Sequence, residues 1–566
     1  MTREPSAFFA IDLGTATTSV SLVARLGGRW RLLGSLAFPR GVEPDQIAGL
    51  LLSRIGRADP ALAAELGIGR AADRDEARAG DPSDANDLAV SPRQSLGSAA
   101  EWPRIVSRTF PPRRLVVLAA GDRRRAQLET TLSGSGWRTS SFSLERDDPL
   151  QMVTAVLDAD VSGVLIASGA SAGPDERRGV RLIADLAGAV IERRPELAVV
   201  LIGGASEHVP GLGAARRAAG RSGALIALPE GVGNEGADER LRGALARVAG
   251  DPADARLGIV RSTVSLATVL DRRLETIEIG LTAGLRTVAG RRPGHPASPR
   301  DERTAIVPEA ALVTAEPDTA QLDGIVAWST VAVDRPRLRD RLRELFLAPW
   351  AEAYGDGAVL RLTAARGALG RLVAATPAFS DLPTPDLLLV SGGAWAVAPP
   401  AAVALAILDL LRRPGVTQLA YDHARLLGPI GTIEDEGERR VLLAELAEDL
   451  LAPLATAVVP QGIQAGRAVG RLILHAGATP VTRDLVGGHV EVVELPPGIT
   501  RTAELEFRDG VVLGGRGRRF ALEVGGGLGG LLVDLRDVPL RLPDAPERRR
   551  ETLAVWQRAT WNELGA

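Results

Sequence analysis

FFAIDLGTATTSVSLV, residues 8–23, places an acid, a glycine and several hydroxyl residues between two apolar runs. Residues 8–11 and 19–23 favour strands, so the stretch predicts a β-hairpin with a tight turn. Glycine lets the backbone approach an anion, hydroxyls can bind phosphate, and the acid can hold Mg²⁺ or its waters. A plain turn, chosen for backbone preferences alone, accounts for the same residues. The candidate binding residues are Asp12, Gly14, Thr15, Thr17 and Thr18, with Asp12 also the candidate metal ligand.

The amino-acid composition excludes several chemistries. The chain has 566 residues, 45% hydrophobic and 24% charged, which is typical of a folded protein with more than one domain. It contains no Cys, which excludes disulfides, thiolate nucleophiles and Cys-ligated metals. All 67 basic residues are Arg, so a Walker-A lysine and a Schiff-base lysine are excluded as well. A net charge of −3 gives no support to nucleic-acid binding.

Two features of the sequence bear on location. The first residues contain no apolar stretch long enough for a signal peptide. The uncharged run at residues 387–408 is long enough to span a bilayer, but Gly and Pro pairs interrupt it. We interpret that run as a strand, a glycine turn and a helix, and we expect a cytoplasmic protein with no membrane partner.

The hydrophobic pattern predicts three domains. Short apolar runs alternate with amphipathic helices between residues 114 and 204, which predicts an α/β domain with a largely parallel sheet. Residues 70–100 are charged and aperiodic, and we interpret them as a disordered excursion. Residues 256–280 contain two strand-like runs around a turn and open a second α/β module. Short runs separated by Gly and Pro then predict a β domain closed by a helix. The predicted domains are residues 1–250, 251–458 and 459–566.

A second glycine turn follows a predicted strand at residues 386–390. Ser391, Gly392 and Gly393 lie between this strand and a helix, where α/β sheets commonly bind ligands. The chain contains, in this order, a hairpin with Asp-x-Gly-Thr, a second hairpin, and a strand that is followed by Gly-Gly and a helix. This order resembles the layout of the actin/hsp70/sugar-kinase superfamily. The resemblance implies an α/β fold of two ribonuclease H-like lobes that clamp ATP, followed here by an all-β C-terminal domain.

Longer segments resemble the glutamate mutase L family. They are LIASGASAGPDERRGVRLIADLAGAV at residues 165–190, the glycine segment and its continuation at residues 387–433, and the β-rich tail at residues 490–543. The resemblance implies an actin-like protein that binds ATP or ADP with Mg²⁺, with Gly169 among its binding residues. It also implies an assembly or reactivation role for an adenosylcobalamin-dependent mutase subunit as partner, with no cobalamin bound directly.

One departure from the family pattern affects the expected activity. The family's second phosphate loop reads Asp-x-Gly-Gly-Ala-Thr-Thr-Asp-Val, and we match it to GIVRSTVSLATV, residues 258–269. Both acids and the glycine pair are absent there, which leaves Arg261, Ser262 and Thr263 as candidate phosphate ligands. We therefore expect nucleotide binding with little or no hydrolysis, a pseudo-ATPase or at most a weak ATPase, and assign no catalytic residue. An interaction scaffold without nucleotide and an active ATPase or sugar-kinase-like phosphotransferase remain as alternatives. The oligomeric state is left open.

Overall fold

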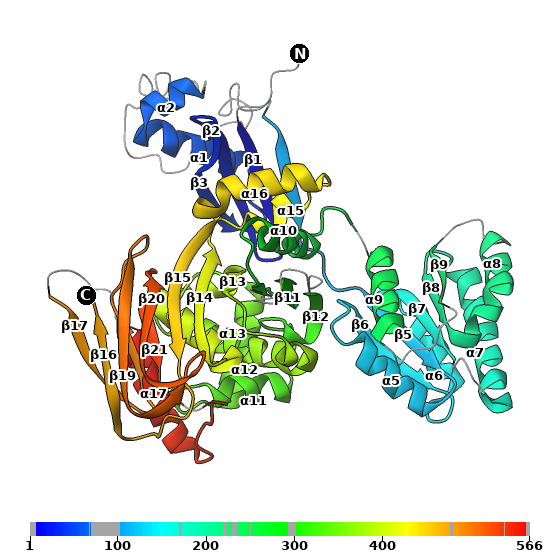
Figure 1. The fold of residues 1–566 in the computed structure, drawn as a ribbon. Helices are drawn as coiled ribbons and strands as arrows, with labels where there is room; N and C mark the ends of the chain where they lie inside the picture. The colour runs from blue at the N-terminus through cyan, green and yellow to red at the C-terminus, as the bar shows by residue number, and fades with distance from the viewer. Residues whose placement is uncertain are drawn as a thin grey trace. The chain divides into compact units, whose positions relative to one another are not determined.

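The computed structural model describes residues 7–66, 68, 102–168, 173–218, 223–228, 235–249, 251–291, 301–351, 353–475, 479–536 and 538–561. The chain forms two compact units. Unit 1 comprises Met1–Phe110, Pro252–Thr304 and Ala310–Ala566, and unit 2 comprises Pro111–Asp251 and Ala305–Glu309. The predicted disordered excursion at residues 70–100 lies outside the described residues. Figure 1 labels the helices and strands, and the two units are described separately below.

The N-terminal sheet of unit 1, which we call lobe I, has the strand order β3-β2-β1-β4. Its strands are β1 (Ala7–Leu13), β2 (Thr17–Leu26), β3 (Arg29–Pro39) and β4 (Arg104–Arg108). β1 and β2 form the antiparallel hairpin that the sequence predicts, β3 pairs antiparallel with β2, and β4 adds to β1 in parallel. The helices α1 (Pro44–Ala58) and α2 (Pro60–Glu65) follow β3. Apolar residues of α1 and the hairpin, among them Phe9, Leu22 and Leu51, form one buried cluster.

The larger sheet of unit 1, which we call lobe II, has the order β12-β11-β10-β13-β14-β15-β21-β18. Its strands are β10 (Leu274–Ile279), β11 (Gly284–Gly290), β12 (Asp301–Val307), β13 (Leu387–Ser391), β14 (Gly415–Asp422), β15 (Leu451–Val459), β18 (Val490–Val493) and β21 (Leu531–Asp534). Its first four strands repeat the order of lobe I, a hairpin meander with a parallel strand added to its first strand. This repetition is the two-lobed, ribonuclease H-like arrangement of actin-like folds, so the predicted fold class is confirmed.

The helices of unit 1 connect these strands. They are α10 (Ala255–Val269), α11 (Thr319–Ala327), α12 (Arg335–Leu347), α13 (Asp356–Ala375), α14 (Pro400–Leu411), α15 (Leu427–Gly431) and α16 (Glu436–Leu450), with short 3₁₀ turns η3 (Pro308–Ala310), η4 (Pro377–Asp381) and η5 (Gly393–Trp395). The run at residues 387–408 forms β13, a glycine turn and α14, as predicted.

Helix α10 corrects the sequence prediction for residues 256–269, where we expected a strand and a turn. Asp254 caps the helix by accepting hydrogen bonds from the backbone N–H groups of Arg256 and Leu257. A Cβ on Gly258 would overlap the carbonyl group of Gly428 in α15. Gly258 therefore permits the close approach of two helices and does not belong to a phosphate loop. The β-branched side chains of this segment led to the strand prediction. Their preference for strands is weak, and packing against α15, α16 and β11 outweighs it.

Helix α16 connects the two lobes of unit 1, and Figure 1 shows it beside the N-terminal hairpin. The Asp449 carboxylate accepts from the Arg31 guanidinium at 2.9 Å and from the backbone N–H of Leu32 at 3.1 Å. The Glu445 carboxylate accepts from the backbone N–H of Trp30 at 2.7 Å. Strand β3 is an edge strand, so these carboxylates satisfy N–H groups that no neighbouring strand pairs.

The C-terminal part of unit 1 contains a separate antiparallel sheet with the order β17-β16-β19-β20. Its strands are β16 (Ala468–Leu474), β17 (Val481–Val486), β19 (Thr500–Val512) and β20 (Arg516–Gly525), and the chain continues to helix α17 (Pro546–Thr560). Strands β18 and β21 instead extend the sheet of lobe II. One apolar cluster, including Leu472, Leu505 and Val533, covers both sheets.

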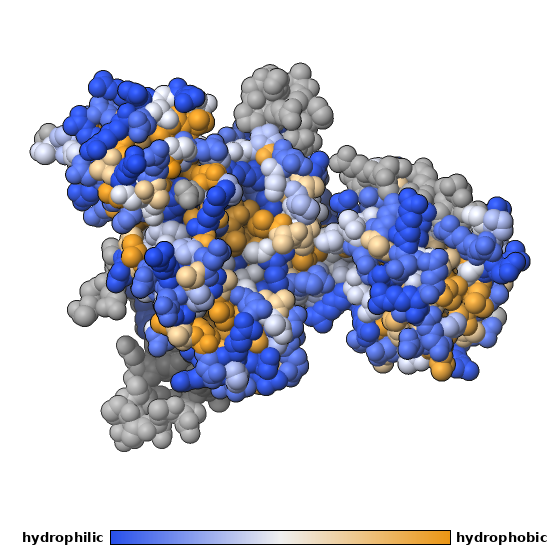
Figure 2. Space-filling model, turned by 90° about the horizontal axis from the view of Figure 1, so that it is seen from below, coloured by the Kyte–Doolittle hydropathy of each residue, from blue (hydrophilic) through white to orange (hydrophobic). Residues whose placement is uncertain are grey.

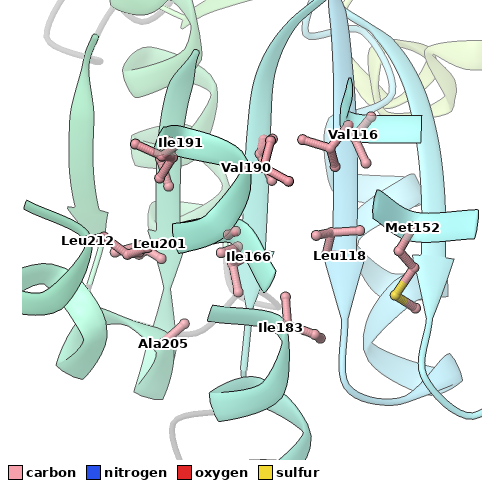
Figure 3. Packing of buried hydrophobic residues seen from close by; sticks show 14 of the residues in the cluster. Val116, Leu118, Met152, Ile166, Ile183, Val190, Ile191, Leu201, Ala205 and Leu212 are labelled. Carbon is pink, nitrogen blue, oxygen red and sulfur yellow. The ribbon is translucent and has the colours of Figure 1, made fainter. Parts of the chain in front are cut away.

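Unit 2 is a parallel α/β domain with the strand order β6-β5-β7-β8-β9, as predicted from the alternating pattern. Its elements are β5 (Arg114–Ala119), α5 (Asp122–Leu132), β6 (Arg138–Ser143), α6 (Pro149–Leu157), β7 (Val161–Ala167), α7 (Pro174–Arg193), β8 (Ala198–Ile202), η2 (Gly203–His208), α8 (Val209–Ala218), β9 (Leu225–Leu228) and α9 (Glu235–Ala249). Figure 3 shows Ile183 and Val190 of α7 beside Leu118 and Ile166 of the sheet.

The surface seen in Figure 2 is largely hydrophilic and carries several hydrophobic patches. Leu347 and Tyr354, which flank the loop between α12 and α13, are 80% and 89% exposed. In the described part of the chain, no helix combines the length and apolar character needed to cross a bilayer.

Candidate functional site

A cavity of about 110 Å³ lies in unit 1, at the ends of strands from both lobes. Its lining includes the turn after β1, the turn after β10, the end of β13 and the segment after β14. Charged residues of these segments and of helices α10 and α13 line the same cavity. They are the acids Asp12, Glu278 and Asp422 and the arginines Arg256, Arg361 and Arg425, of which Arg256 lies in α10 and Arg361 in α13.

Two turns of the lining are equivalent to each other. In lobe I, Leu13 pairs with Thr18 and closes the turn of residues 14–17. In lobe II, Ile279 pairs with Gly284 and closes a turn of the same length, residues 280–283. Asp12 and Glu278 are each the residue before the closing pair, and Gly14 and Gly280 each follow it in their turn. The acid-x-Gly motif therefore occurs once in each lobe.

The parallel neighbours of these turns are equivalent too. Asp12 of β1 lies opposite Ser107 of β4, and Glu278 of β10 lies opposite Ser391 of β13. The Ser107 hydroxyl donates to Asp12 Oδ1 at 2.8 Å. Burial raises the pKa of Asp12, while Arg425 and the Ser107 hydrogen bond lower it in part. Asp12 is thus held in place by a neighbouring strand, which suits a group that must keep a fixed position.

Glu278 is a buried acid with an unused acceptor. Burial raises its pKa to about 7, and Arg256 opposes this shift while Asp12 adds to it. Glu278 Oε2 lies 4.0 Å from Arg256 Nε and has no hydrogen-bond partner among the described residues. A Cβ on Gly280 would lie 2.6 Å from Glu278 Oε1, so glycine is needed for this carboxyl to fold against its own turn. Glu278 therefore keeps an acceptor for a ligand, a water or a proton.

Asp422 ends strand β14 and organises the segment that follows. Its carboxylate accepts from the backbone N–H groups of Leu426 at 2.9 Å and Leu427 at 3.3 Å, and from the Ser391 hydroxyl at 3.2 Å. Burial raises its pKa to about 6, against the lowering effect of these hydrogen bonds. Asp422 is fully buried, so its main visible role is to fix the start of α15 and the loop before it.

Arg425 lies in that loop with a left-handed backbone, φ 54°, which is uncommon for a residue other than glycine. Its guanidinium donates to the Thr17 hydroxyl of lobe I. A Cβ on Gly393 would lie 2.7 Å from Arg425 Nη2, so the guanidinium also lies against the glycine turn after β13. Arg425 therefore contacts segments of both lobes at the cavity.

The glycine turn after β13 makes a close backbone contact with β10. Gly392 has φ 97°, and a Cβ there would lie 2.8 Å from the carbonyl oxygen of Ile279. The Tyr421 hydroxyl donates to the Gly392 carbonyl at 3.2 Å. The positive φ and the close contact with the Ile279 carbonyl both require glycine at position 392. The backbone of this turn lines the cavity.

The structure places the sequence-predicted residues in three groups. Those that line the cavity are Asp12, Gly14, Thr15, Thr17, Gly392 and Gly393. Thr18 is buried in β2 and is not part of the lining, and Gly169 lies outside the described residues. The others belong to α10, not to a loop, which corrects the prediction. The Ser262 hydroxyl donates to the Leu427 carbonyl at 2.7 Å, the Thr263 hydroxyl donates to Thr276 at 2.8 Å, and Arg261 does not line the cavity.

Sequence reasoning missed Glu278, Asp422, Arg256 and Arg425. Glu278 had a detectable signal, because Glu278-Ile279-Gly280 after a strand-like run repeats Asp12-Leu13-Gly14. The match to residues 258–269 hid this repeat. Asp422 and Arg425 had no signal of that kind, since only the fold brings them to the two turns.

The donor set does not make a closed metal cage. Within the described residues, no group of three or more His, Asp and Glu side chains is arranged to hold a metal ion. Mg²⁺ commonly keeps several waters and binds one or two carboxylates together with substrate phosphates. Asp12 fits that second arrangement as the one carboxylate that would hold the ion together with phosphate and waters.

Comparisons with known proteins give only distant similarities. No family model matches the chain, and a search of curated proteins finds no relative. Among solved structures, the nucleotide-free structure of acetone carboxylase is 10% identical over 84% of this chain and 80% of its own, with a TM-score of 0.28. A Ppx/GppA family member from Aquifex aeolicus is 7% identical over 78% and 88%, with a TM-score of 0.17. An ATP-dependent caprolactamase from Pseudomonas jessenii is 9% identical over 84% and 81%, with a TM-score of 0.25.

Proposed function

We propose that the cavity of unit 1 binds a nucleotide, ATP or ADP, together with Mg²⁺. One observation carries the proposal: Asp12 and Glu278 hold equivalent positions in two acid-x-Gly turns, and both turns line one cavity with the glycine turn after β13. Glycine turns expose backbone N–H groups to an anion, and hydroxyls and Arg side chains can complete phosphate binding in a chain without Lys.

Residues of both turns would contact the nucleotide and its cation. The Thr15 and Thr17 hydroxyls lie in the first turn, and Thr282 lies in the second, where its hydroxyl accepts from Arg256 Nη2 at 2.6 Å. Asp12 would hold the cation directly or through water. The bound cation would neutralise phosphate charge. A ligand held by turns of both lobes would favour a closed arrangement of the lobes, which is the basis of a nucleotide-dependent switch.

Glu278 is the residue we propose to accept a proton in any hydrolysis step. Asp12 Oδ1 is bonded to Ser107 and both oxygens of Asp422 accept hydrogen bonds, whereas Glu278 Oε2 is unpartnered among the described residues. A pKa of about 7 suits a general base near neutral pH. The absence of acids and of the glycine pair from residues 258–269 was the reason for expecting a pseudo-ATPase, but that segment is a helix that lines the cavity through Ile259 and forms no phosphate loop.

Calorimetry with Mg²⁺–ATP, combined with a phosphate-release assay, tests the proposal. We expect wild-type binding that Asp12→Ala weakens at least tenfold, about 1.4 kcal/mol, and that Arg261→Ala leaves unchanged. Glu278→Gln should retain binding and abolish any phosphate release. Binding without release identifies a switch, and release sensitive to Glu278→Gln identifies an ATPase. An absence of binding overturns the proposal and favours the interaction scaffold. Phosphate transfer to an added sugar would favour the phosphotransferase.

We further propose, from the sequence resemblance to the glutamate mutase L family, that an adenosylcobalamin-dependent mutase subunit is the partner. The segments at residues 165–190, 387–433 and 490–543 support this proposal. The test is co-purification with such a subunit, followed by a reactivation assay with and without nucleotide. A mutase that recovers equally well without this protein contradicts the proposal.

A further inference from the structure

Arg425 differs from Arg256 of the same cavity in its partners. Arg256 donates to the Phe110 carbonyl at 3.0 Å and to Thr282 at 2.6 Å, and its Nε lies 4.0 Å from Glu278 Oε2. Arg425 donates to Thr17 alone, and in the described part of the chain no carboxylate lies within ion-pair distance of its guanidinium. A half-buried guanidinium with remaining donors, in a cavity of this kind, is suited to an anionic ligand.

The backbone at Arg425 is held in an unfavourable conformation by its neighbours. A non-glycine residue at φ 54° costs free energy, and such residues persist where the surroundings impose them. Asp422 supplies that constraint through its bonds to the N–H groups of Leu426 and Leu427. The Ala424 carbonyl adds a second, because it accepts from the Ser21 hydroxyl of β2 at 3.0 Å. The loop therefore presents the guanidinium at a set position between the lobes.

The guanidinium lies beside two of the turns that would hold the phosphate chain of the proposed nucleotide. It contacts Thr17 in the first turn and lies against Gly393 in the glycine turn. We propose that Arg425 binds the terminal phosphates of the nucleotide and exchanges its Thr17 contact for a phosphate oxygen. This inference rests on the proposed nucleotide site and adds to it a specificity for phosphate number.

If Arg425 exchanges Thr17 for a phosphate oxygen, its partner would depend on how many phosphates the bound nucleotide carries. A nucleoside monophosphate would leave the Thr17 contact in place, whereas a triphosphate would replace it by a guanidinium–phosphate pair. In that pair both partners are charged and two parallel hydrogen bonds can form, whereas the Thr17 hydroxyl is neutral and accepts one. Arg425 would then connect the phosphate chain to the loop that Asp422 and Ser21 hold.

The test compares ATP, ADP, AMP and inorganic tripolyphosphate, each with Mg²⁺, by calorimetry on the full chain. Arg425→Gly is the main variant, because glycine accepts φ 54° and the backbone should keep its conformation. We expect ATP and tripolyphosphate to bind about 10- to 100-fold more weakly, with AMP changed less than about threefold. Arg425→Lys should restore part of the loss, and Arg261→Ala should cause none.

The outcomes separate this inference from the proposed function. If wild type binds ATP in an Asp12-dependent way and Arg425→Gly keeps the same ratio of ATP to AMP affinity, the role of Arg425 is wrong and the nucleotide site stands. If Arg425→Gly weakens the binding of ATP and of AMP equally, Arg425 positions the loop and does not distinguish nucleotides by phosphate number, which also overturns the inference. If wild type binds none of the four ligands, both proposals fall. Near-ultraviolet circular dichroism confirms that the variants are folded.

Discussion

Asp12 and Glu278 are equivalent residues of the two lobes of unit 1. Each is the penultimate residue of the first strand of a hairpin, each is followed by x-Gly at a turn of the same length, and each lies opposite a serine of the neighbouring parallel strand. Asp12 has Ser107 as a hydrogen-bond donor, whereas Ser391 donates to Asp422 and leaves Glu278 Oε2 unpartnered among the described residues. The repeated fold therefore presents two acids to one cavity in different states of hydrogen bonding.

Glu278→Gln should stabilise the protein in a pH-dependent way. The pKa of Glu278 is about 7 in the folded chain against 4.5 for the ordinary side chain, so the folded state binds the extra proton between these values. Wild-type stability therefore falls as the pH rises from about 4.5 to 7, by up to about 3 kcal/mol. Thermal unfolding midpoints should differ little between wild type and variant at pH 4.5 and should favour the variant at pH 8. Glu448→Gln, at a side chain that is 88% exposed, is the control. A difference that is independent of pH contradicts the assignment.

Gly258→Ala should destabilise unit 1 although alanine favours helices. Helix propensity alone predicts a gain of about 1 kcal/mol, but the new Cβ would overlap the Gly428 carbonyl, and overpacking of this kind costs about 1–3 kcal/mol. Chemical denaturation measures the net loss. Gly56→Ala in α1 is the matched control, because the nearest atom to its Cβ is Ala63 Cβ at 3.9 Å and a small gain is expected there. A gain at both positions would show that α10 and α15 are not in close contact.

Arg536→Met should destabilise the attachment of the C-terminal strands to lobe II. The Arg536 guanidinium donates to both oxygens of Asp534 at 2.8 Å and to Asp409 of α14 at 2.6 Å, over the ring of Trp556. Burial alone would lower the pKa of Arg536, but these carboxylates raise it, so the cation is retained. Removing it leaves each buried carboxylate with one cation, Asp409 with Arg366 and Asp534 with Arg412. We therefore expect a loss smaller than the one of about 3–5 kcal/mol that follows when a buried ion pair loses one partner outright.

Two further variants make the Arg536 prediction specific. Arg536→Met combined with Asp409→Asn should cost less than the sum of the two single changes, since both remove the same Arg536–Asp409 contact. Arg519→Met, at an exposed pair with Glu506 of 3.5 Å, should change the unfolding midpoint hardly at all, about 0–1 kcal/mol. Equal effects of Arg536→Met and Arg519→Met would contradict the structural role of the buried cluster.

Trp350→Leu should weaken nucleotide binding without affecting inorganic polyphosphate. Trp350 lies in the loop between α12 and α13, lines the cavity and is 37% exposed. An aromatic face can stack on a base for about 0.5–1.5 kcal/mol, which corresponds to about 2- to 10-fold in affinity. Competition binding with ATP and tripolyphosphate measures the two effects. Tyr354→Leu, at a residue that is 89% exposed and outside the lining, is the control. An equal loss of affinity for both ligands would show that Trp350 supports the structure of the site and does not contact the base.

The sequence predicted the turn of lobe I that lines the cavity and missed the equivalent turn of lobe II. Asp12, Gly14 and Thr17 were found because they lie within a few residues of each other in one hairpin. The prediction for residues 258–269 was wrong because short runs rich in Val, Ile and Thr suit a strand or a buried helix equally well. Tertiary packing decides between them, and here Gly258 against Gly428 and the bond from Ser262 to Leu427 decide for a helix.

The sequence by itself determined which elements form and which chemistry is available. Hairpin, glycine turn and apolar helix follow from local periodicity, and in a chain without Lys the permanently charged side chain available to an anion is the guanidinium of Arg. Tertiary structure alone decided that Glu278 and Asp12 line one cavity and that Arg425 reaches Thr17. Residues more than 250 positions apart meet through strand register and helix packing, because those long-range pairings are selected by the burial of whole faces and not by local pattern.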